Sequence, residues 1–359
     1  MKDFVYVGTY TGGSLSDHRD TQSKGIYCFA CSPGYDKLTF RGTYGKNEID
    51  PGFLIIKDGF LFAENERRDM GTVRSFSIAA DGALTLCSVM ETEGSKCAFL
   101  SAHPSGKYIF ATNYASGSLM IISCDDTGKL SLTDKVQHYG KSVVPVRQDA
   151  PRAHSVRLTP DGKGLLVPDL GIDKIMNYQF DEQKGLVQPN SLQPYVMVDP
   201  GEGPRHLVFH PNGKYVYLDT EIGNHVYVYA YDNTNQTIRQ IQKIALLPDD
   251  YTGKSYSAEI LISSDGRFVY VCNRGHDTIT CYQVDVDTGL LSHEGWFPSG
   301  GKGPRHIIFT PDEKYLYCAN KDGDLVTILE RDRQTGSLGE VIGAYEVPAP
   351  SALAWYGRK

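Results

Sequence analysis

The sequence has no excess of positive charge. It carries 36 lysines and arginines against 43 aspartates and glutamates, which gives a formal net charge of −7 at pH 7. Nonspecific binding to nucleic acid or to an anionic membrane needs a basic face. We therefore expect neither a nucleic-acid nor a membrane partner, although a local basic pocket is compatible with this balance.

Long apolar runs are also missing. No stretch approaches the roughly 20 apolar residues that cross a bilayer. The first residues, MKDFVYVGTYTGG, lack the apolar core of a signal peptide, so we expect a cytoplasmic protein. The C-x-x-C of Cys28 and Cys31 has no second pair, and most of the eight cysteines lie in strand-like runs. We expect reduced cysteines that serve as small apolar residues.

Several motifs that carry catalysis or bind cofactors are absent. There is no G-x-x-x-x-G-K-S/T phosphate loop, no dinucleotide-binding fingerprint, no G-x-S-x-G elbow and no H-E-x-x-H pair. The missing elbow disfavours a serine nucleophile. The sequence predicts neither a metal site nor a cofactor.

What the sequence has instead is a repeat. Tyrosine (23) and glycine (37) are abundant, and patterns for long helices are scarce. One unit of about 50 residues recurs: an apolar run, a P-x-G-K-type turn, a second apolar run, a polar turn and two further strands. The first apolar runs are GFLIIK (52–57), AFLSAH (98–103), HSVRLT (154–159), HLVFHP (206–211), EILISS (259–264), HIIFTP (306–311) and SALAWY (351–356).

The two ends of the chain complete each other. The sequence begins on a run of the second type, FVYVGTY (4–10), and ends on a run of the first type, SALAWY (351–356). A last strand that pairs with the first sheet closes a ring and removes its open edge. The sequence thus predicts an all-β, seven-bladed β-propeller of four-stranded antiparallel blades, formed as one domain over residues 1–359. The absence of a repeated Trp-Asp disfavours WD40 repeats.

Polar residues recur where the first run starts and the second run ends. In a propeller blade the first strand lines the channel and the second runs antiparallel to it, so both positions lie at one mouth. We expect these residues to converge on one cavity: Arg152, His154, Arg205, His206, Glu259, Arg305 and His306 at the starts, and Asn65, Asn113, Asp169, Glu221, Asn273, Arg274, Asn320 and Lys321 at the ends.

The chemistry of this set indicates a small anionic ligand. Arginine clusters bind carboxylate or phosphate through forked donors. Histidine and glutamate can transfer protons near neutral pH. Glu221 among several arginines is expected to be ionised with a low pKa. The P-x-G-K turns at the other end of the blades are expected to be structural.

Several stretches together resemble one known family, the seven-bladed propeller lactonases, over essentially the whole chain. Its founding activity is the bacterial propeller type of 6-phosphogluconolactonase, and the fungal carboxy-cis,cis-muconate cyclase is a relative. The stretches are VGTYT (7–11) with SKGIY (23–27), NYASGSL (113–119), RQDAPRAHSV (147–156), GPRHLVFHPNGKYVY (203–217) and VCNRGHDTI (271–279).

The resemblance implies a site and a reaction. The family's proposed site corresponds to His154, Arg205, Glu221 and Arg274, and its activity is hydrolysis of 6-phospho-D-glucono-1,5-lactone in the oxidative pentose phosphate pathway. One departure is Arg152, which stands where the family often has a second histidine. Our hypothesis makes His154 the general base, assisted by Glu221, while arginines hold the phosphate and the oxyanion. Substrate-binding support is expected from Arg152, His206, Glu259, Arg305, His306, Asn113 and Asn273.

Two other readings stay open. The site could serve another lactonase or a muconate-type cycloisomerase, in which the arginines would grip carboxylates. Alternatively, the propeller could bind a metabolite or a protein without catalysis, because the fold hosts many functions. The sequence leaves the oligomeric state open. The longer insertion at 125–150 is expected to form a rim or lid over the mouth.

Overall fold

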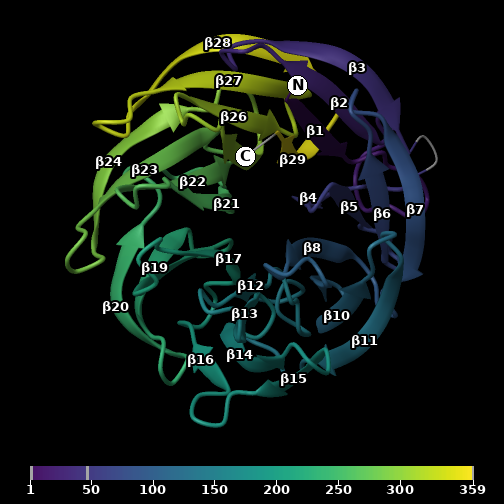
Figure 1. Ribbon diagram of the computed structural model, residues 1–359. Coiled ribbons are helices and arrows are strands. Elements are labelled where there is room, and N and C mark those ends of the chain that lie inside the picture. Colours follow the sequence, from purple (N-terminus) through teal and green to yellow (C-terminus); the bar gives the residue numbers. More distant parts are fainter. Residues whose placement is uncertain (1–2, 46–47, 358–359) are drawn as a thin grey trace.

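The structure is a computed structural model that describes residues 3–45 and 48–357. Residues 1, 2, 46, 47, 358 and 359 of the predicted domain lie outside the described part. All 29 elements within it are β-strands. They form seven antiparallel sheets arranged as blades around a central axis (Figure 1). The predicted all-β, seven-bladed propeller is confirmed.

The innermost strand of each blade lies nearest the axis in Figure 1. These strands are β29 (Pro350–Tyr356), β4 (Leu54–Lys57), β8 (Cys97–Ala102), β12 (Arg157–Leu158), β17 (Pro204–Phe209), β21 (Tyr256–Ile262) and β25 (Pro304–Phe309). The second strands are β1 (Phe4–Thr9), β5 (Phe60–Asn65), β9 (Tyr108–Asn113), β13 (Gly164–Asp169), β18 (Tyr215–Thr220), β22 (Phe268–Arg274) and β26 (Tyr315–Asn320).

The two outer strands of each blade complete the sheet. The third strands are β2 (Ile26–Cys31), β6 (Thr72–Ile78), β10 (Ser118–Cys124), β14 (Lys174–Asp181), β19 (His225–Asp232), β23 (Thr278–Val284) and β27 (Leu325–Arg331). The fourth strands are β3 (Leu38–Tyr44), β7 (Leu84–Glu91), β11 (Leu130–Gln137), β15 (Leu186–Pro189) with β16 (Tyr195–Met197), β20 (Thr237–Ala245), β24 (Leu291–Pro298) and β28 (Leu338–Glu346).

The ring closes as the two ends of the sequence predicted. Strand β29 pairs antiparallel with β1, so that Phe4 lies opposite Tyr356 and Val7 opposite Leu353. The blade so formed also packs its apolar side chains against the last blade, with Val5 and Phe29 in one cluster with Tyr317. Closure therefore removes a hydrogen-bonding edge and buries apolar surface in the same step.

Tyrosines of the second strands join neighbouring blades. Each donates its hydroxyl to a backbone carbonyl in the outer turn of the next blade: Tyr6 to Gly82, Tyr217 to Gly289, Tyr270 to Gly336 and Tyr317 to Tyr35. The ring of such a tyrosine fills the interface while the hydroxyl satisfies a buried acceptor. This recurring contact accounts for part of the high tyrosine content.

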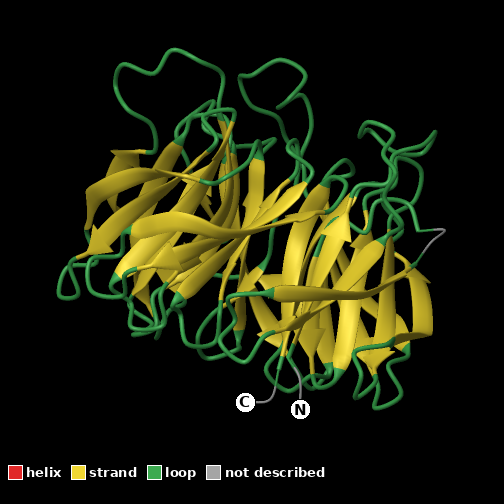
Figure 2. Cartoon of the chain, turned by 90° about the horizontal axis from the view of Figure 1, so that it is seen from above, coloured by secondary structure: helices red, strands yellow, loops and turns green. Residues whose placement is uncertain are grey.

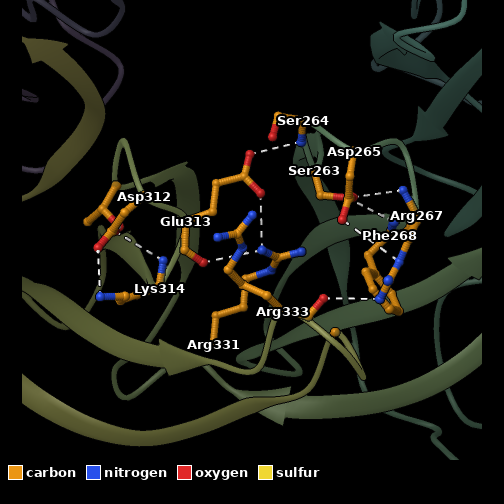
Figure 3. Close-up of polar contacts among 12 residues, drawn as sticks. Ser263, Ser264, Asp265, Arg267, Phe268, Asp312, Glu313, Lys314, Arg331 and Arg333 are labelled. Atoms are coloured by element: carbon orange, nitrogen blue, oxygen red, sulfur yellow. Dashed lines mark hydrogen bonds and ion pairs between the residues drawn. The ribbon is translucent and has the colours of Figure 1, made fainter.

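Charged contacts between blades also occur at the far ends of the hairpins (Figure 3). The carboxylate of Glu313 accepts from the backbone N–H of Ser264 at 2.8 Å and pairs with Arg331 Nη1 at 3.1 Å. Arg331 also donates through Nε to Tyr270 at 2.8 Å. The contact links two blades away from the channel mouth, so it stabilises the ring without adding to the mouth.

One blade departs from the predicted pattern. The run at 154–159 was expected to be a strand, but only Arg157–Leu158 is regular, so His154 precedes the strand. The neighbouring Pro168 lacks an N–H, which removes a ladder donor beside this segment. The fourth strand of the same blade is split into β15 and β16, both paired with β14.

The mouth lies on the face that carries the longest loops. Residues 10–25 and 138–156 connect strands on that face, whereas β1 starts and β29 ends on the opposite one (Figure 2). The predicted insertion at 125–150 needs correction, because residues 130–137 form the ordinary fourth strand β11. The extra length is in the loop that follows it. Within the described residues no helix is long and apolar enough to cross a membrane.

Candidate active site at the channel mouth

Glu221 is the centre of a cationic cluster at the mouth. Its Oε2 lies 2.8 Å from Arg205 Nε, 3.0 Å from Arg274 Nη2 and 3.5 Å from His154 Nε2. Its Oε1 accepts from Arg147 Nη2. The four residues proposed from the resemblance are thus brought together around one carboxylate, although they come from three blades.

A β-bulge explains how two consecutive residues both reach the channel. In a regular strand, neighbouring side chains point to opposite faces. Strand β17 has one extra residue between Pro204 and Leu207 against β18, which breaks the alternation. A bulge re-aims a side chain in this way, and both Arg205 and His206 are buried. The starts of β8, β21 and β25 carry similar shifts.

The charges around Glu221 decide its ionisation. Burial by itself would raise the pKa of Glu221, but Arg274, the His154 hydrogen bond and Arg205 outweigh it and hold the pKa well below its usual range. Burial, helped by Arg205 and opposed by Glu221, lowers the pKa of His154 to about 4. Near neutral pH the pair is therefore a carboxylate facing a neutral imidazole.

A second carboxylate lies deeper in the channel. Glu259 Oε2 is 3.0 Å from His206 Nδ1 and 3.6 Å from His306 Nε2, and its Oε1 is 3.6 Å from Arg157 Nη2. Burial raises the pKa of Glu259 to about 7, against the opposing effect of Arg157 and Arg205. Two of the expected histidines thus contact this deeper group and not Glu221.

Arg305 occupies a third part of the mouth. Its guanidinium lies over the Tyr10 ring at 5.0 Å from the centroid, and Nη2 is 3.9 Å from Glu66 Oε2. Glu66 also accepts from the Tyr10 hydroxyl at 2.8 Å and faces His18 Nε2 at 3.5 Å. Burial would raise the pKa of Glu66, but His18, Arg305 and Tyr10 lower it to about 2. At this part of the mouth the ionised carboxylate of Glu66 therefore lies near the Arg305 guanidinium without a close hydrogen bond to it.

Three expected binding residues lie outside these contacts. Asn113 is buried and donates to Thr92 O at 3.1 Å and Ser118 Oγ at 3.0 Å. Asn273 donates to Thr280 Oγ1 at 2.8 Å within its own blade. Arg152 donates to Ala115 O and pairs with Asp149, both at 2.8 Å. The contacts of these three side chains are with the scaffold and the rim.

The sequence analysis missed two contributors to the cluster. Arg147 comes from the loop after β11 and supplies a third guanidinium to Glu221. Tyr114 packs edge-on against His154 with ring centroids 5.3 Å apart. Tyr114 directly follows Asn113, just as Arg274 follows Asn273, so the position after this recurring asparagine was the available signal. Nothing comparable marked Arg147, because its loop belongs to no repeat.

The described residues contain no group of three or more histidines, cysteines, aspartates or glutamates arranged to hold a metal ion. All eight cysteines are free thiols, and Cys28 and Cys31 are buried in β2. The polar groups at the mouth are instead guanidinium, imidazole and carboxylate. This set suits an anionic substrate and proton transfer.

Comparisons with known proteins agree with this fold. The family described as "Lactonase, 7-bladed beta-propeller" matches residues 4–355. The 6-phosphogluconolactonase of Bacillus subtilis (strain 168) is 31% identical over 307 residues, which cover 85% of this chain and 84% of that protein. The structure of the periplasmic gluconolactonase of Pseudomonas aeruginosa has a TM-score of 0.90 at 29% identity and covers 99% of both chains.

A third relative points the same way. The crystal structure of a protein from Bacteroides fragilis, described as a putative 6-phosphogluconolactonase, has a TM-score of 0.89 at 30% identity, covering 99% of this chain and 98% of that one. The chain therefore belongs to the seven-bladed β-propeller lactonases, a family of lactone-hydrolysing enzymes.

Proposed function

We propose that the protein hydrolyses 6-phospho-D-glucono-1,5-lactone to 6-phosphogluconate. The observation that carries this proposal is the ionised Glu221 held by Arg205, Arg274 and Arg147 beside a neutral His154 at the channel mouth. The similarity to the B. subtilis 6-phosphogluconolactonase supports the choice of substrate. The product would enter the pentose phosphate pathway, and we place the enzyme in the cytoplasm.

His154 acts as the general base on the attacking water. Glu221 faces its Nε2 at 3.5 Å, so the carboxylate orients the ring and leaves Nδ1 as the proton acceptor. Nδ1 is buried and has no hydrogen-bond partner within residues 3–45 and 48–357. A base held in this tautomer takes the proton as the water oxygen bonds to the lactone carbonyl carbon.

The arginines around Glu221 stabilise the developing oxyanion. When the carbonyl carbon becomes tetrahedral, negative charge grows on its oxygen, and preorganised guanidinium donors lower the energy of that state. Arg205 and Arg274 are suited to this because Glu221 and the backbone carbonyls of Ala258 and Ser257 hold them in place. Breaking the ring C–O bond then releases an alkoxide, which takes up the proton.

Arg305 is the group that we assign to the 6-phosphate. Arg205, Arg274 and Arg147 already face Glu221, whereas the nearest carboxylate that pairs with Arg305 in the described part of the chain is Glu66, at 3.9 Å. Stacking on Tyr10 orients its planar fork. A guanidinium so presented can form a bidentate contact with a phosphate.

A second candidate substrate is the unphosphorylated gluconolactone. The structurally similar P. aeruginosa protein is described as a periplasmic gluconolactonase. The two candidates differ only in the phosphate, so they make opposite predictions for Arg305. Ring closure of a dicarboxylate and non-catalytic binding are the further alternatives, and both predict no hydrolysis of either lactone.

Initial rates on both lactones test the proposal. Purified protein should consume 6-phosphogluconolactone well above the spontaneous background and faster than gluconolactone. His154→Ala should lower kcat by about 100-fold or more while the far-ultraviolet circular dichroism stays unchanged. Arg305→Met should raise KM for the phosphorylated substrate alone. Equal rates on both lactones would favour the second candidate, and wild-type kcat in His154→Ala would remove histidine from the mechanism.

A further inference from the structure

Arg147 is the most exposed of the three guanidinium groups around Glu221. Its side chain is 33% exposed, whereas those of Arg274 and Arg205 are 16% and 2% exposed. It binds Oε1 of Glu221, while the other two guanidinium groups lie against Oε2. The proposed mechanism uses Arg205 and Arg274 for the carbonyl oxygen and leaves Arg147 without a role.

The backbone that carries Arg147 is strained at the residue before it. Val146 has a φ of 69°, in the left-handed region that β-branched residues rarely adopt. The N–H of Arg147 donates to Pro145 O at 2.8 Å across Val146, which makes a γ-turn of the rare form with positive φ. The Val146 side chain is 77% exposed, so its own burial does not offset this strain. Strain of this kind persists where the surrounding structure fixes it, often at functional sites.

Gln148 anchors the turn to the scaffold. Its side chain is buried, and its Nε2 donates to Leu170 O at 2.8 Å. Its Oε1 accepts from Val144 N at 3.0 Å, and its backbone N–H donates back to Val144 O at 2.9 Å. A buried anchor thus holds a strained turn within an exposed segment. The result of this arrangement is the fixed direction of the Arg147 side chain toward the mouth.

The Arg147 guanidinium keeps donors for a ligand. Glu221 takes one of its five N–H donors. The guanidinium carbon lies 5.5 Å from the centroid of the Tyr256 ring, which supports the plane of the group. Because the Glu221 carboxylate offsets its charge at close range, Arg147 attracts a phosphate less than Arg305 does, whose pair with Glu66 is 3.9 Å long. A neutral oxygen acceptor, such as a hydroxyl group, suits Arg147 better.

We propose that Arg147 binds the hydroxyl group on the ring carbon next to the lactone carbonyl, and so determines the preference of the enzyme for hydroxylated lactones. This inference rests on the proposed function. With the carbonyl oxygen on Arg205 and Arg274, the hydroxyl on the neighbouring carbon is the nearest one to a guanidinium that shares their carboxylate. The strained turn at Val146 positions that guanidinium.

Two lactones that differ by this hydroxyl test the contact. Wild-type protein should hydrolyse 6-phosphogluconolactone with a kcat/KM about 10- to 100-fold above that for its 2-deoxy form, since the 2-deoxy lactone cannot make one charge-assisted hydrogen bond. Arg147→Met should lower kcat/KM for the parent lactone by the same factor. It should change kcat/KM for the 2-deoxy lactone by less than about twofold, because Arg205 and Arg274 still neutralise Glu221. The inhibition constant of the 2-deoxy lactone gives the same comparison if its turnover is too slow to measure.

Two substitutions at Val146 test the positioning. Glycine adopts a positive φ without strain, so Val146→Gly should keep kcat/KM on both lactones within about twofold of wild type. Proline fixes φ at about −65°, so Val146→Pro should turn Arg147 away from Glu221 and reproduce the substrate-dependent loss of Arg147→Met. Because the Val146 side chain is exposed, neither substitution removes a buried contact. The two variants are therefore matched controls for each other.

Far-ultraviolet circular dichroism shows whether each variant is folded. If Arg147→Met does not fold, Arg147→Lys carries the same comparison, because it keeps a charge toward Glu221 but loses the forked donors. The contact is overturned if the wild type hydrolyses both lactones with equal kcat/KM, or if the Arg147 variant changes both values by the same factor. The positioning is overturned if a folded Val146→Pro behaves like Val146→Gly. A wild type without activity on either lactone would instead refute the proposed function itself.

Discussion

Glu221 and Glu259 are two carboxylates in one channel with opposite behaviour. They are almost equally buried, with 6% and 3% of their surface exposed. Glu221 contacts guanidinium groups at 2.8 and 3.0 Å, while Glu259 contacts a neutral imidazole at 3.0 Å and a guanidinium only at 3.6 Å. The pKa of the first is lowered and that of the second is raised. Direct contact with cations, and not the depth of burial, therefore explains why the pKa shifts of the two carboxylates have opposite signs.

Replacing Glu221 should have the largest effect. In Glu221→Gln an amide cannot neutralise Arg147, Arg205 and Arg274, so we expect a loss of about 1000-fold in kcat/KM and of about 3–5 kcal/mol in the free energy of unfolding. Urea unfolding and initial rates measure both. Glu313→Gln is the control, because its pair with Arg331 lies at the far hairpins (Figure 3). Stability should fall there while activity stays, and the same result in Glu221→Gln would contradict its role.

The two carboxylates should also change the free energy of unfolding with pH in opposite directions. A raised pKa means that the contribution of Glu259 is complete below its unfolded pKa and is lost as pH rises through about 7. The lowered pKa of Glu221 means that its contribution to stability is present above its pKa in the unfolded chain. This contribution is lost as the pH falls through its lower pKa in the folded protein. Glu259→Gln should therefore remove a stability loss on the order of 3 kcal/mol between about pH 5 and pH 8. Chemical denaturation at each pH measures it, and a profile unchanged by the substitution would count against the assignment.

A smaller effect is expected from the one guanidinium that faces Glu259 directly. Arg157 Nη2 lies 3.6 Å from Glu259 and lowers its pKa. Arg157→Met should therefore raise the midpoint of the Glu259 titration by about one pH unit. Carbon-13 NMR follows this shift. A midpoint that does not move would show that Arg157 is too well solvated to influence the group.

The smallest effect on activity is expected at Asn113. Its side chain contacts Ser118 in its own blade and Thr92, which directly follows the fourth strand of the preceding blade. Asn113→Ala should lower the free energy of unfolding by about 1–2 kcal/mol and change kcat/KM by less than about twofold. If kcat/KM falls by more than tenfold without a loss of stability, Asn113 binds substrate after all.

The Asn113 case shows what the repeat reveals about function. Six second strands end at Thr9, Asn65, Asn113, Asp169, Thr220 and Asn320, and Asn273 is the equivalent residue one position before the end of β22; all seven are buried. The residues that follow these seven are Tyr10, Glu66, Tyr114, Leu170, Glu221, Lys321 and Arg274. A side chain that recurs from blade to blade stabilises the blade itself, whereas a side chain that differs between blades is available to form the site. The sequence analysis combined both positions, which is why Asn113 and Asn273 were included with Arg274.

The local pattern of residues along the chain was sufficient to predict the fold and to predict at which mouth of the channel the site lies. The alternation of apolar runs, the turn residues and the complementary ends predicted the closed ring, because each reflects hydrogen bonding within a single hairpin or sheet. The same reasoning predicted that His154, Arg205, Glu221 and Arg274 would meet at one mouth. The structure brings these four together.

The sequence by itself determined a ring with a cationic, acid–base mouth. Only the tertiary structure decided that Arg147 from a loop without a repeat reaches Glu221, that a bulge lets Arg205 and His206 share the channel, and that Glu259 is separated from close cations. The physical reason is that ionisation depends on burial and on distances of a few ångströms between side chains of different blades. Such distances arise only when the whole ring has closed.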